Sequence, residues 1–187
     1  MSLKLPRTLR LDPSDTFVFE HAAEPGEWAV TGSFLFLDTD PASLGPKART
    51  AFRSGFVGVN SLGFSTLVVV SEASETERDA AVEALATHIL TRFGAPDHEA
   101  ARAAAREEID VAASLCNLAV GSVVAMHRAA DGGEIREEFR TLSQRPGADR
   151  LHGRAFHFVE TDEDESSDAP EEQADLVGLL RGTPTGR

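Results

Sequence analysis

Apolar and polar side chains alternate in three stretches of the chain that each carry a Phe-x-Phe pair. These pairs are Phe17/Phe19, Phe34/Phe36 and Phe156/Phe158. Residues two apart share one face of a strand, so the pattern predicts three strands that offer aromatic faces to a common core. The run from Thr66 to Val70 is apolar on both faces, which predicts a central strand covered on both sides.

Two longer segments in the middle of the chain follow helical spacing instead. Ser74-x-x-Glu77 is a capping box, and Gly94 stands where the C-terminal cap of the same helix is expected. A second, alanine-rich helix opens at Pro96-Asp97 and ends near Cys116. The two apolar stripes comprise Val82, Leu85, Ala86, Ile89 and Phe93, then Ala105, Ile109, Ala112 and Cys116. We predict a two-helix hairpin over residues 75–116 and a shorter helix over about residues 42–53.

The order of these elements indicates the fold class. Strands come first, then a helix, two strands, the two helices and three more strands, the last of which ends at Val159. Blocks of this kind favour α+β layers over an alternating parallel sheet. We predict a single α+β domain over residues 1–159, in which a mostly antiparallel sheet is packed by the central two-helix hairpin.

Residues 160–187 differ in composition from the rest of the chain. They hold nine acidic residues and two arginines, and the first sixteen of them include no aromatic residue. Such a segment buries too little apolar surface to offset the entropy of ordering, so we predict a disordered acidic tail. Leu176, Leu179 and Leu180 then form one narrow apolar stripe, which is a candidate partner-binding element.

Charge and hydropathy exclude several classes of partner. The 187 residues carry a formal charge of −13 with no basic stripe, so we expect no nucleic-acid partner. The longest aliphatic run, Leu67–Val70, is far shorter than the ~20 residues of a membrane span, so we expect no membrane partner. No apolar segment follows the basic N-terminus, and the lone Cys116 forms no internal disulfide. We therefore expect a cytoplasmic protein.

The stretch RSGFVGVNSLGF, residues 53–64, places three glycines among large apolar residues. Gly55, Gly58 and Gly63 match neither G-x-G-x-x-G nor a P-loop, and they lead from a helix into a strand rather than into a helix N-terminus. We expect Gly55 to cap the helix and no phosphate to bind. A turn on Asn60-Ser61 would set Gly58 opposite Gly63 and leave a notch in the sheet. Either a packing neighbour or a ligand could fill it, and we favour packing.

A hairpin with its turn on Gly132-Gly133 pairs Arg128 with Glu137 across two strands. Glu137 then lies between two apolar residues on its face, opposite a cation. Such a pair can orient a ligand or act as an acid or base, although a salt bridge near the sheet edge is the simpler interpretation. A turn one residue earlier would give a different register.

The remaining candidates for chemistry are weak. His152 and His157 are five apart and point to opposite faces of a strand, and no H-E-x-x-H, paired cysteine or calcium loop occurs. We therefore expect no metal and no cofactor. Cys116 lies near a helix C-terminus, where the helix dipole disfavours a thiolate. No G-x-S-x-G is present. We name no catalytic residue and favour a protein that is not an enzyme.

Four stretches carry a resemblance to known proteins: LRLDPSDTFVFEHAAEPGEWAV, FRSGFVGVNSLGFSTLVVV, ASLCN and GEIREEFRTL. Over about residues 4–142 the chain resembles a small bacterial family of uncharacterised proteins, a domain of unknown function. The resemblance implies a bacterial cytoplasmic protein. It implies no activity, ligand or catalytic residue.

Three functions stay open. The one we favour is a non-catalytic accessory or protein-interaction protein, which holds a protein partner through Leu176, Leu179 and Leu180. The second is a small-molecule-binding protein or a metal-independent enzyme, with a pocket formed by Gly58, Gly63, Arg128 and Glu137. The third is a subunit of a homo-oligomer.

Overall fold

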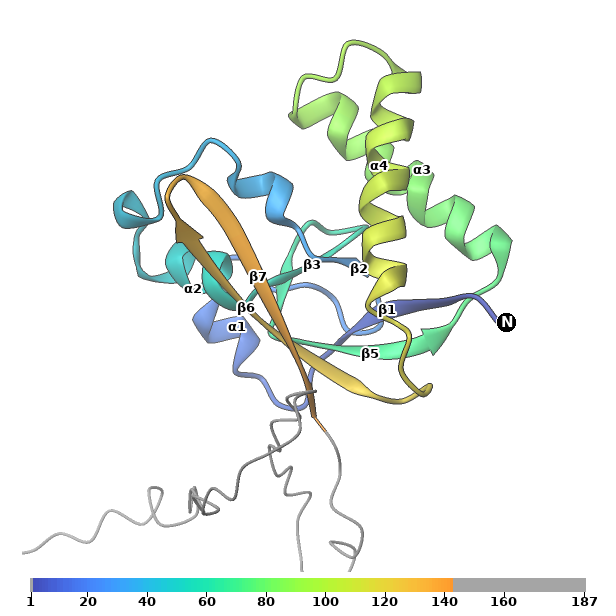
Figure 1. Ribbon diagram of the computed structural model, residues 1–187, viewed down its shortest axis with the longest axis horizontal. Helices are drawn as coiled ribbons and strands as arrows, with labels where there is room; N and C mark the ends of the chain where they lie inside the picture. The colour runs from blue at the N-terminus through green and yellow to red at the C-terminus, as the bar shows by residue number, and fades with distance from the viewer. Residues whose placement is uncertain (1, 143–187) are drawn as a thin grey trace, which may run out of the picture.

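The computed structural model describes residues 2–142 of the chain (Figure 1). Its elements are β1 (Lys4–Leu9), α1 (Asp15–Val18), β2 (Ala29–Val30), η1 (Ser33–Phe36), η2 (Pro41–Ser43), α2 (Pro46–Ser54), β3 (Phe56–Gly58), β4 (Phe64–Ser65), β5 (Leu67–Glu72), α3 (Glu75–Arg92), α4 (His98–Ser114), β6 (Val123–Asp131) and β7 (Glu134–Leu142). The predicted strand around Phe156/Phe158, the domain boundary at residue 159 and the acidic tail with its leucine stripe lie outside the described residues.

Two antiparallel sheets form the body of the protein. The larger has the strand order β1-β5-β6-β7, and the smaller has the order β2-β3-β4. A single antiparallel bridge between Arg7 and Trp28 brings β2 beside β1, so the two sheets adjoin. Helices and antiparallel sheets occupy separate stretches of the chain, which confirms the predicted α+β class.

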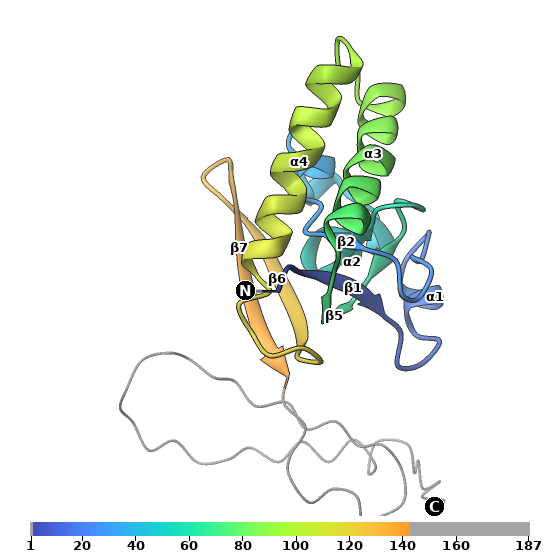
Figure 2. The same ribbon diagram turned by 90° about the vertical axis from the view of Figure 1, so that its right-hand side faces the viewer.

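The helical hairpin is confirmed at both of its helices. The side-chain oxygen of Ser74 accepts the N–H of Glu77, and the Glu77 carboxylate accepts the N–H of Ser74, which completes the predicted capping box. Asp97 caps α4 by accepting the N–H of Ala100. Figure 2 shows α3 and α4 side by side. Their buried residues pack with Leu5 of β1 and with apolar residues of β2 and β3 in one core. Two predicted stripe residues lie elsewhere, because Phe93 is 44% exposed and Cys116 belongs to a second apolar cluster.

The Phe-x-Phe pairs within the described residues do not form strands, so this prediction was wrong. Phe17 lies in the short helix α1 and is 71% exposed, whereas Phe19 is 1% exposed. Phe34 and Phe36 lie in the 3₁₀ helix η1. A turn of helix can bury one ring of such a pair and expose the other, so a spacing of two is not specific to strands.

The backbone at Gly32 explains why the strand ends before Phe34. Gly32 has φ +79°, and a Cβ atom there would lie 2.2 Å from Cγ2 of Val57. The chain therefore leaves the sheet after β2 and enters η1. Its Phe36 ring then joins an aromatic cluster with Phe52 and Phe64, at centroid distances of 5.3 and 6.1 Å.

The run after Thr66 forms β5, which lies between β1 and β6 as predicted for a central strand. Val68 and Val70 are buried, but Leu67 and Val69 on the opposite face are only half-buried. The expectation of complete cover on both faces is thus corrected. The shorter helix, α2, begins at Pro46 because the residues before it form the separate 3₁₀ turn η2. None of the helices between residues 2 and 142 combines the length and hydrophobicity that crossing a bilayer requires.

Candidate functional site

The glycine-rich turn between β3 and β4 brings Gly58 and Gly63 face to face, as the sequence predicted. The N–H of Gly58 donates to the carbonyl of Gly63 at 2.9 Å. The turn between them is longer than expected, because it comprises the four residues 59–62, and Leu62 in it has φ +55°. Gly55 ends α2 as predicted, and its N–H donates to the carbonyl of Ala51.

The notch beside Gly58 is filled by the carboxylate of Glu27. One oxygen of this buried side chain accepts the N–H groups of Asn60 and Ser61 at 3.0 and 2.9 Å, and the other accepts the N–H of Glu24 at 2.7 Å. A Cβ atom on Gly58 would lie 2.6 Å from Glu27 Oε2. The turn does hold an anion, and that anion is a side chain of the protein itself.

Protein atoms also fill the space beside Gly63. A Cβ atom there would lie 2.6 Å from the carbonyl oxygen of Ala22 and from the nitrogen of Ala23. Both glycines therefore admit neighbouring protein atoms to the sheet, which agrees with the packing interpretation. A ligand contact at Gly58 and Gly63 stays a prediction, and in this conformation protein atoms occupy the space that the ligand would need.

Arg128 is the most deeply buried charged residue among the described residues, with 0% of its surface exposed. The β6–β7 register pairs it with Glu137, which confirms the predicted hairpin. Its Nε donates to Glu137 Oε1 at 2.9 Å, Nη1 donates to the carbonyl of Phe52 at 2.7 Å, and Nη2 donates to the carbonyl of Thr31 at 2.6 Å. One guanidinium thus ties β6 and β7 to the end of α2 and to the segment after β2.

The charged side chains around Arg128 shift one another's pKa values. Burial lowers the pKa of Arg128, and the charge and hydrogen bond of Glu137 raise it. Glu108 of α4 is the third member of the cluster. The pKa of Glu108 is raised to about 7, mainly by burial and to a smaller extent by the negative charge of Glu137. The positive charge of Arg128 opposes that rise. Arg128 thus forms an ion pair with Glu137 and also stabilises the charged form of Glu108, whose pKa is raised chiefly by burial.

Sequence reasoning missed Glu108. Its only local signal is its position beside Ala105, Ile109 and Ala112, the buried stripe of α4. Any polar residue flanking a buried stripe gives the same signal. The effect of Glu137 on Glu108 depends on where tertiary packing places α4 relative to β7, which the sequence pattern does not indicate.

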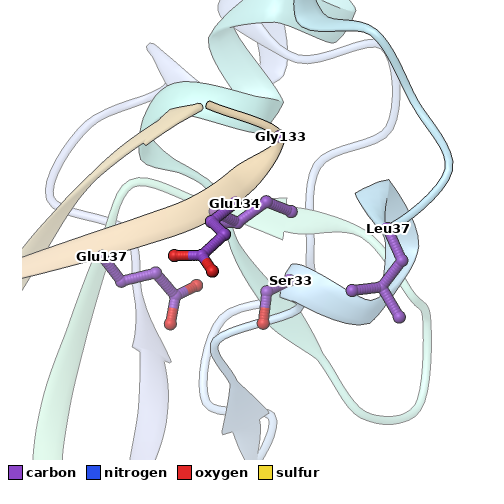
Figure 3. A pocket seen from close by; sticks show the side chains of 6 residues that line it. Ser33, Leu37, Gly133, Glu134 and Glu137 are labelled. Carbon is purple, nitrogen blue, oxygen red and sulfur yellow. The ribbon is translucent and has the colours of Figure 1, made fainter. Parts of the chain in front are cut away.

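An open pocket of about 460 Å³ lies next to this cluster, and Figure 3 shows its lining. It is lined by Ser33, Leu37, Gly133, Glu134, Ile135 and Glu137. The carboxylates of Glu134 and Glu137 and the hydroxyl of Ser33 face one another, with the apolar Leu37 on the other side (Figure 3). Carboxylate and hydroxyl oxygens arranged in this way can accept hydrogen bonds from an ammonium or guanidinium group.

The structure divides the predicted ligand site into two parts. Arg128 and Glu137 lie together on β6 and β7 of the larger sheet, and Glu137 lines the pocket. Gly58 and Gly63 lie at the turn of the smaller sheet and do not line this pocket. Ligand binding at these four residues stays a prediction, and only Glu137 lies at this pocket.

Two further side chains with potential chemistry, Cys116 and His88, have structural roles. Cys116 is buried, and burial raises the pKa of its thiol to about 11. His88 lies within 2.9 Å of the Asn60 carbonyl and so helps to hold the glycine-rich turn. Within residues 2–142, no three His, Cys, Asp or Glu side chains gather in a way that could hold a metal ion.

Comparison with known protein families gives a match. A model described as "Family of unknown function (DUF6505)" matches residues 1–164. No curated protein and no solved structure matches the chain.

Proposed function

Since the chain belongs to this family of unknown function, we propose a role from its own residues. The protein is a bacterial cytoplasmic accessory protein without catalytic activity, and it acts by binding other protein chains. The observation that carries this proposal is the outer edge of β7. β7 pairs with β6 along its whole length, and no strand between residues 2 and 142 pairs with its other side. Figure 2 shows β7 at the margin of the molecule.

The register identifies the main-chain groups on this edge. Gly132 and Gly133 have φ +60° and +89°, as the two central residues of a type I′ turn require. The residues that flank such a two-residue turn, Asp131 and Glu134, form a hydrogen-bonded pair, and the two kinds of pair alternate from there. The N–H and C=O groups of Ile135, Glu137 and Phe139 therefore point away from β6.

The usual protection of an edge strand is incomplete on β7. Proteins shield such edges with proline, a bulge, charged side chains or an inward-pointing charge, and β7 does carry charged side chains. β7 has no proline, and its register is continuous from Glu134 to Leu142. Glu137 does point inward, but the guanidinium of Arg128 neutralises it. An extended segment of another chain can therefore add to this edge through main-chain hydrogen bonds.

Ile135→Pro tests this role. Proline removes the outward N–H of residue 135 and leaves the hydrogen-bonded pairs with β6 intact, and Ile135→Val is the matched control that keeps the N–H. We expect chains that co-purify with the wild type and the control to be lost from Ile135→Pro. Circular dichroism would show that all three proteins are folded. An unchanged set of co-purified chains would contradict the proposal.

The leucine stripe of the acidic tail is a second proposed partner-binding element, and it lies outside the described residues. Leu176, Leu179 and Leu180 would lie in a groove of a partner or on the protein's own domain. Deletion of residues 160–187 should remove partners that depend on the stripe. If the same proteins co-purify before and after the deletion, the stripe has no such role.

A second candidate function follows from the pocket beside Glu137, namely binding of a small organic cation by a protein or a metal-independent enzyme. Its support is the pair of carboxylates of Glu134 and Glu137 (Figure 3). A thermal-shift screen of amine-containing metabolites tests it, because a ligand at a hundred times its dissociation constant adds about 2.7 kcal/mol of stability. Glu134→Gln should abolish the shift without altering the melting temperature of the free protein. A screen without any stabilising cation would remove the candidate.

A further inference from the structure

The outer face of β7, which we define as the face opposite Glu137, carries charges of alternating sign. Arg136, Glu138 and Arg140 lie on this face, and β6 pairs them with Ala129, His127 and Ala125. Glu134, the first residue of β7, continues the alternation of charge in the sequence, but its side chain lines the pocket beside Glu137. In the register of the hairpin, Glu134 is directly opposite Asp131, a residue of the same charge. Arg136 forms a diagonal ion pair with Asp131 at 3.2 Å, and both side chains are exposed.

The sequence of β7 is complementary to itself about Glu137. Residues equally far on either side of Glu137 in the sequence carry opposite charges, Glu134 with Arg140 and Arg136 with Glu138. Of these two pairs, Arg136 and Glu138 lie on the outer face. The inner-face residues next to Glu137 are both apolar, Ile135 and Phe139. In an antiparallel pair of two β7 strands related by a twofold axis at Glu137, Arg136 of each copy would directly oppose Glu138 of the other.

We infer that the chain bound at the edge of β7 is a second copy of this protein, held by antiparallel β7–β7 pairing about Glu137. The inference rests on the proposed function, because it names the partner of the same edge. The twofold axis makes the interface isologous and joins two four-stranded sheets into one continuous sheet.

Main-chain geometry agrees with this register. Ile135, Glu137 and Phe139 direct their N–H and C=O groups to the free edge. Centring on Glu137 sets Ile135 opposite Phe139 of the second copy, and Glu137 opposite its own counterpart. The outward N–H and C=O groups of one copy therefore face the outward C=O and N–H groups of the other, as the hydrogen-bonded pairs of an antiparallel ladder require.

Charge excludes the neighbouring registers. Centring on Arg136 would set Arg136 against its own copy and Glu134 against Glu138. Centring on Glu138 would set Glu138 against its own copy and Arg136 against Arg140. Directly opposed like charges destabilise a strand pair, whereas opposite charges stabilise it. Of these three registers, only the Glu137 centre sets Arg136 opposite Glu138 in both directions across the axis.

The centre of the interface brings two Glu137 side chains together, and the structure offsets their repulsion. Each Glu137 Oε1 accepts a hydrogen bond from the buried guanidinium of its own Arg128 at 2.9 Å. The carboxylates therefore approach one another as members of ion pairs. This gives the arginine a role at the interface besides its structural one.

Charge reversal in the full-length chain tests the pairing. We expect light scattering coupled to size exclusion to give the mass of a dimer for the wild type and for Lys47→Glu, an exposed reversal on α2. Arg136→Glu and Glu138→Arg should each weaken the dimer about tenfold or more, because each turns two attractive pairs into repulsive ones. An equimolar mixture of these two variants should form a heterodimer, and the double variant should dimerise again.

Each outcome decides the inference. A dimer that resists both single reversals, or variants that fail to dimerise on mixing, would overturn the Glu137-centred pairing. A monomeric wild type would overturn the second copy as partner. If the wild type is a monomer but Ile135→Pro still loses co-purified chains, the proposed function stands without the second copy. If Ile135→Pro also leaves the set of co-purified chains unchanged, the proposed function is wrong as well. In a monomer, protection of the Ile135 and Phe139 amides from hydrogen exchange would instead assign the edge to residues 143–187 of the same chain.

Discussion

Replacing Arg128 by Met should destabilise the protein by about 4 kcal/mol, because the change leaves three buried acceptors without their donor. The side chain of Glu137, 16% exposed, keeps its charge, and the carbonyls of Thr31 and Phe52 lose their hydrogen bonds. Breaking a buried ion pair by removal of one partner costs about 3–5 kcal/mol. Met fills much of the same volume, so the cavity contribution is small.

Urea denaturation followed by circular dichroism, at one fixed protein concentration, measures this cost. With a total stability of about 5–15 kcal/mol the variant stays folded, and its melting temperature should fall by about 8–16 °C. Arg53→Met, the same change on an exposed part of α2, is the control and should stay within about 0.5 kcal/mol of the wild type.

A double variant tests the electrostatic part of this reasoning. Arg128→Met/Glu137→Leu removes both charges, so no carboxylate is left unpaired, and at least about 2 kcal/mol should return. A cost of Arg128→Met below about 1 kcal/mol, or a double variant no more stable than Arg128→Met, would refute the assignment of Arg128 as the group that joins β6 to α2.

Three further variants test other parts of the structure. Gly63→Ala should cost about 2 kcal/mol or more in urea denaturation, because its Cβ would lie 2.6 Å from the backbone of Ala22, whereas Gly45→Ala, with open space at its Cβ, should cost less than about 1 kcal/mol. Glu108 has a folded-state pKa raised to about 7, so wild-type stability should fall as pH rises from about 4.5 to 7 and then level off. Glu108→Gln should remove that slope and exceed the wild type in urea midpoint at pH 8, and equal slopes for both proteins would contradict this. Ser74→Ala should lower stability by about 1 kcal/mol through loss of the α3 cap, and an unchanged melting temperature would count against it.

The glycine-rich turn shows how a pattern associated with anion binding can serve the fold alone. The N–H groups of Asn60 and Ser61 converge on one oxygen of Glu27. Glu27 lies more than thirty residues earlier in the chain, beside β2. The sequence excluded a phosphate loop because no helix begins after the glycines. It did not identify Glu27, because an acidic residue next to a short strand has no distinctive spacing.

Local signals in the sequence determined the elements whose hydrogen bonds close over a few residues. The capping box at Ser74, the apolar stripes of α3 and α4 and the Gly132-Gly133 turn depend on near neighbours, so spacing alone indicated the helical hairpin and the β6–β7 register. The pairing of Arg128 with Glu137 followed from that register.

Tertiary structure alone decided the conformation of the Phe-x-Phe segments and the positions of Glu27 and Glu108. Their contacts form only when segments that are distant in the sequence pack together. The Phe-x-Phe pairs gave the wrong element, since burial of Phe19 and Phe36 depends on rings contributed by α2 and β4. Glu27 reached the notch, and Glu108 reached the Arg128 cluster, through the packing of separate elements. Hydrogen bonds and charges over such distances leave no periodic trace in a sequence, because any chain that folds back at the right place can supply them.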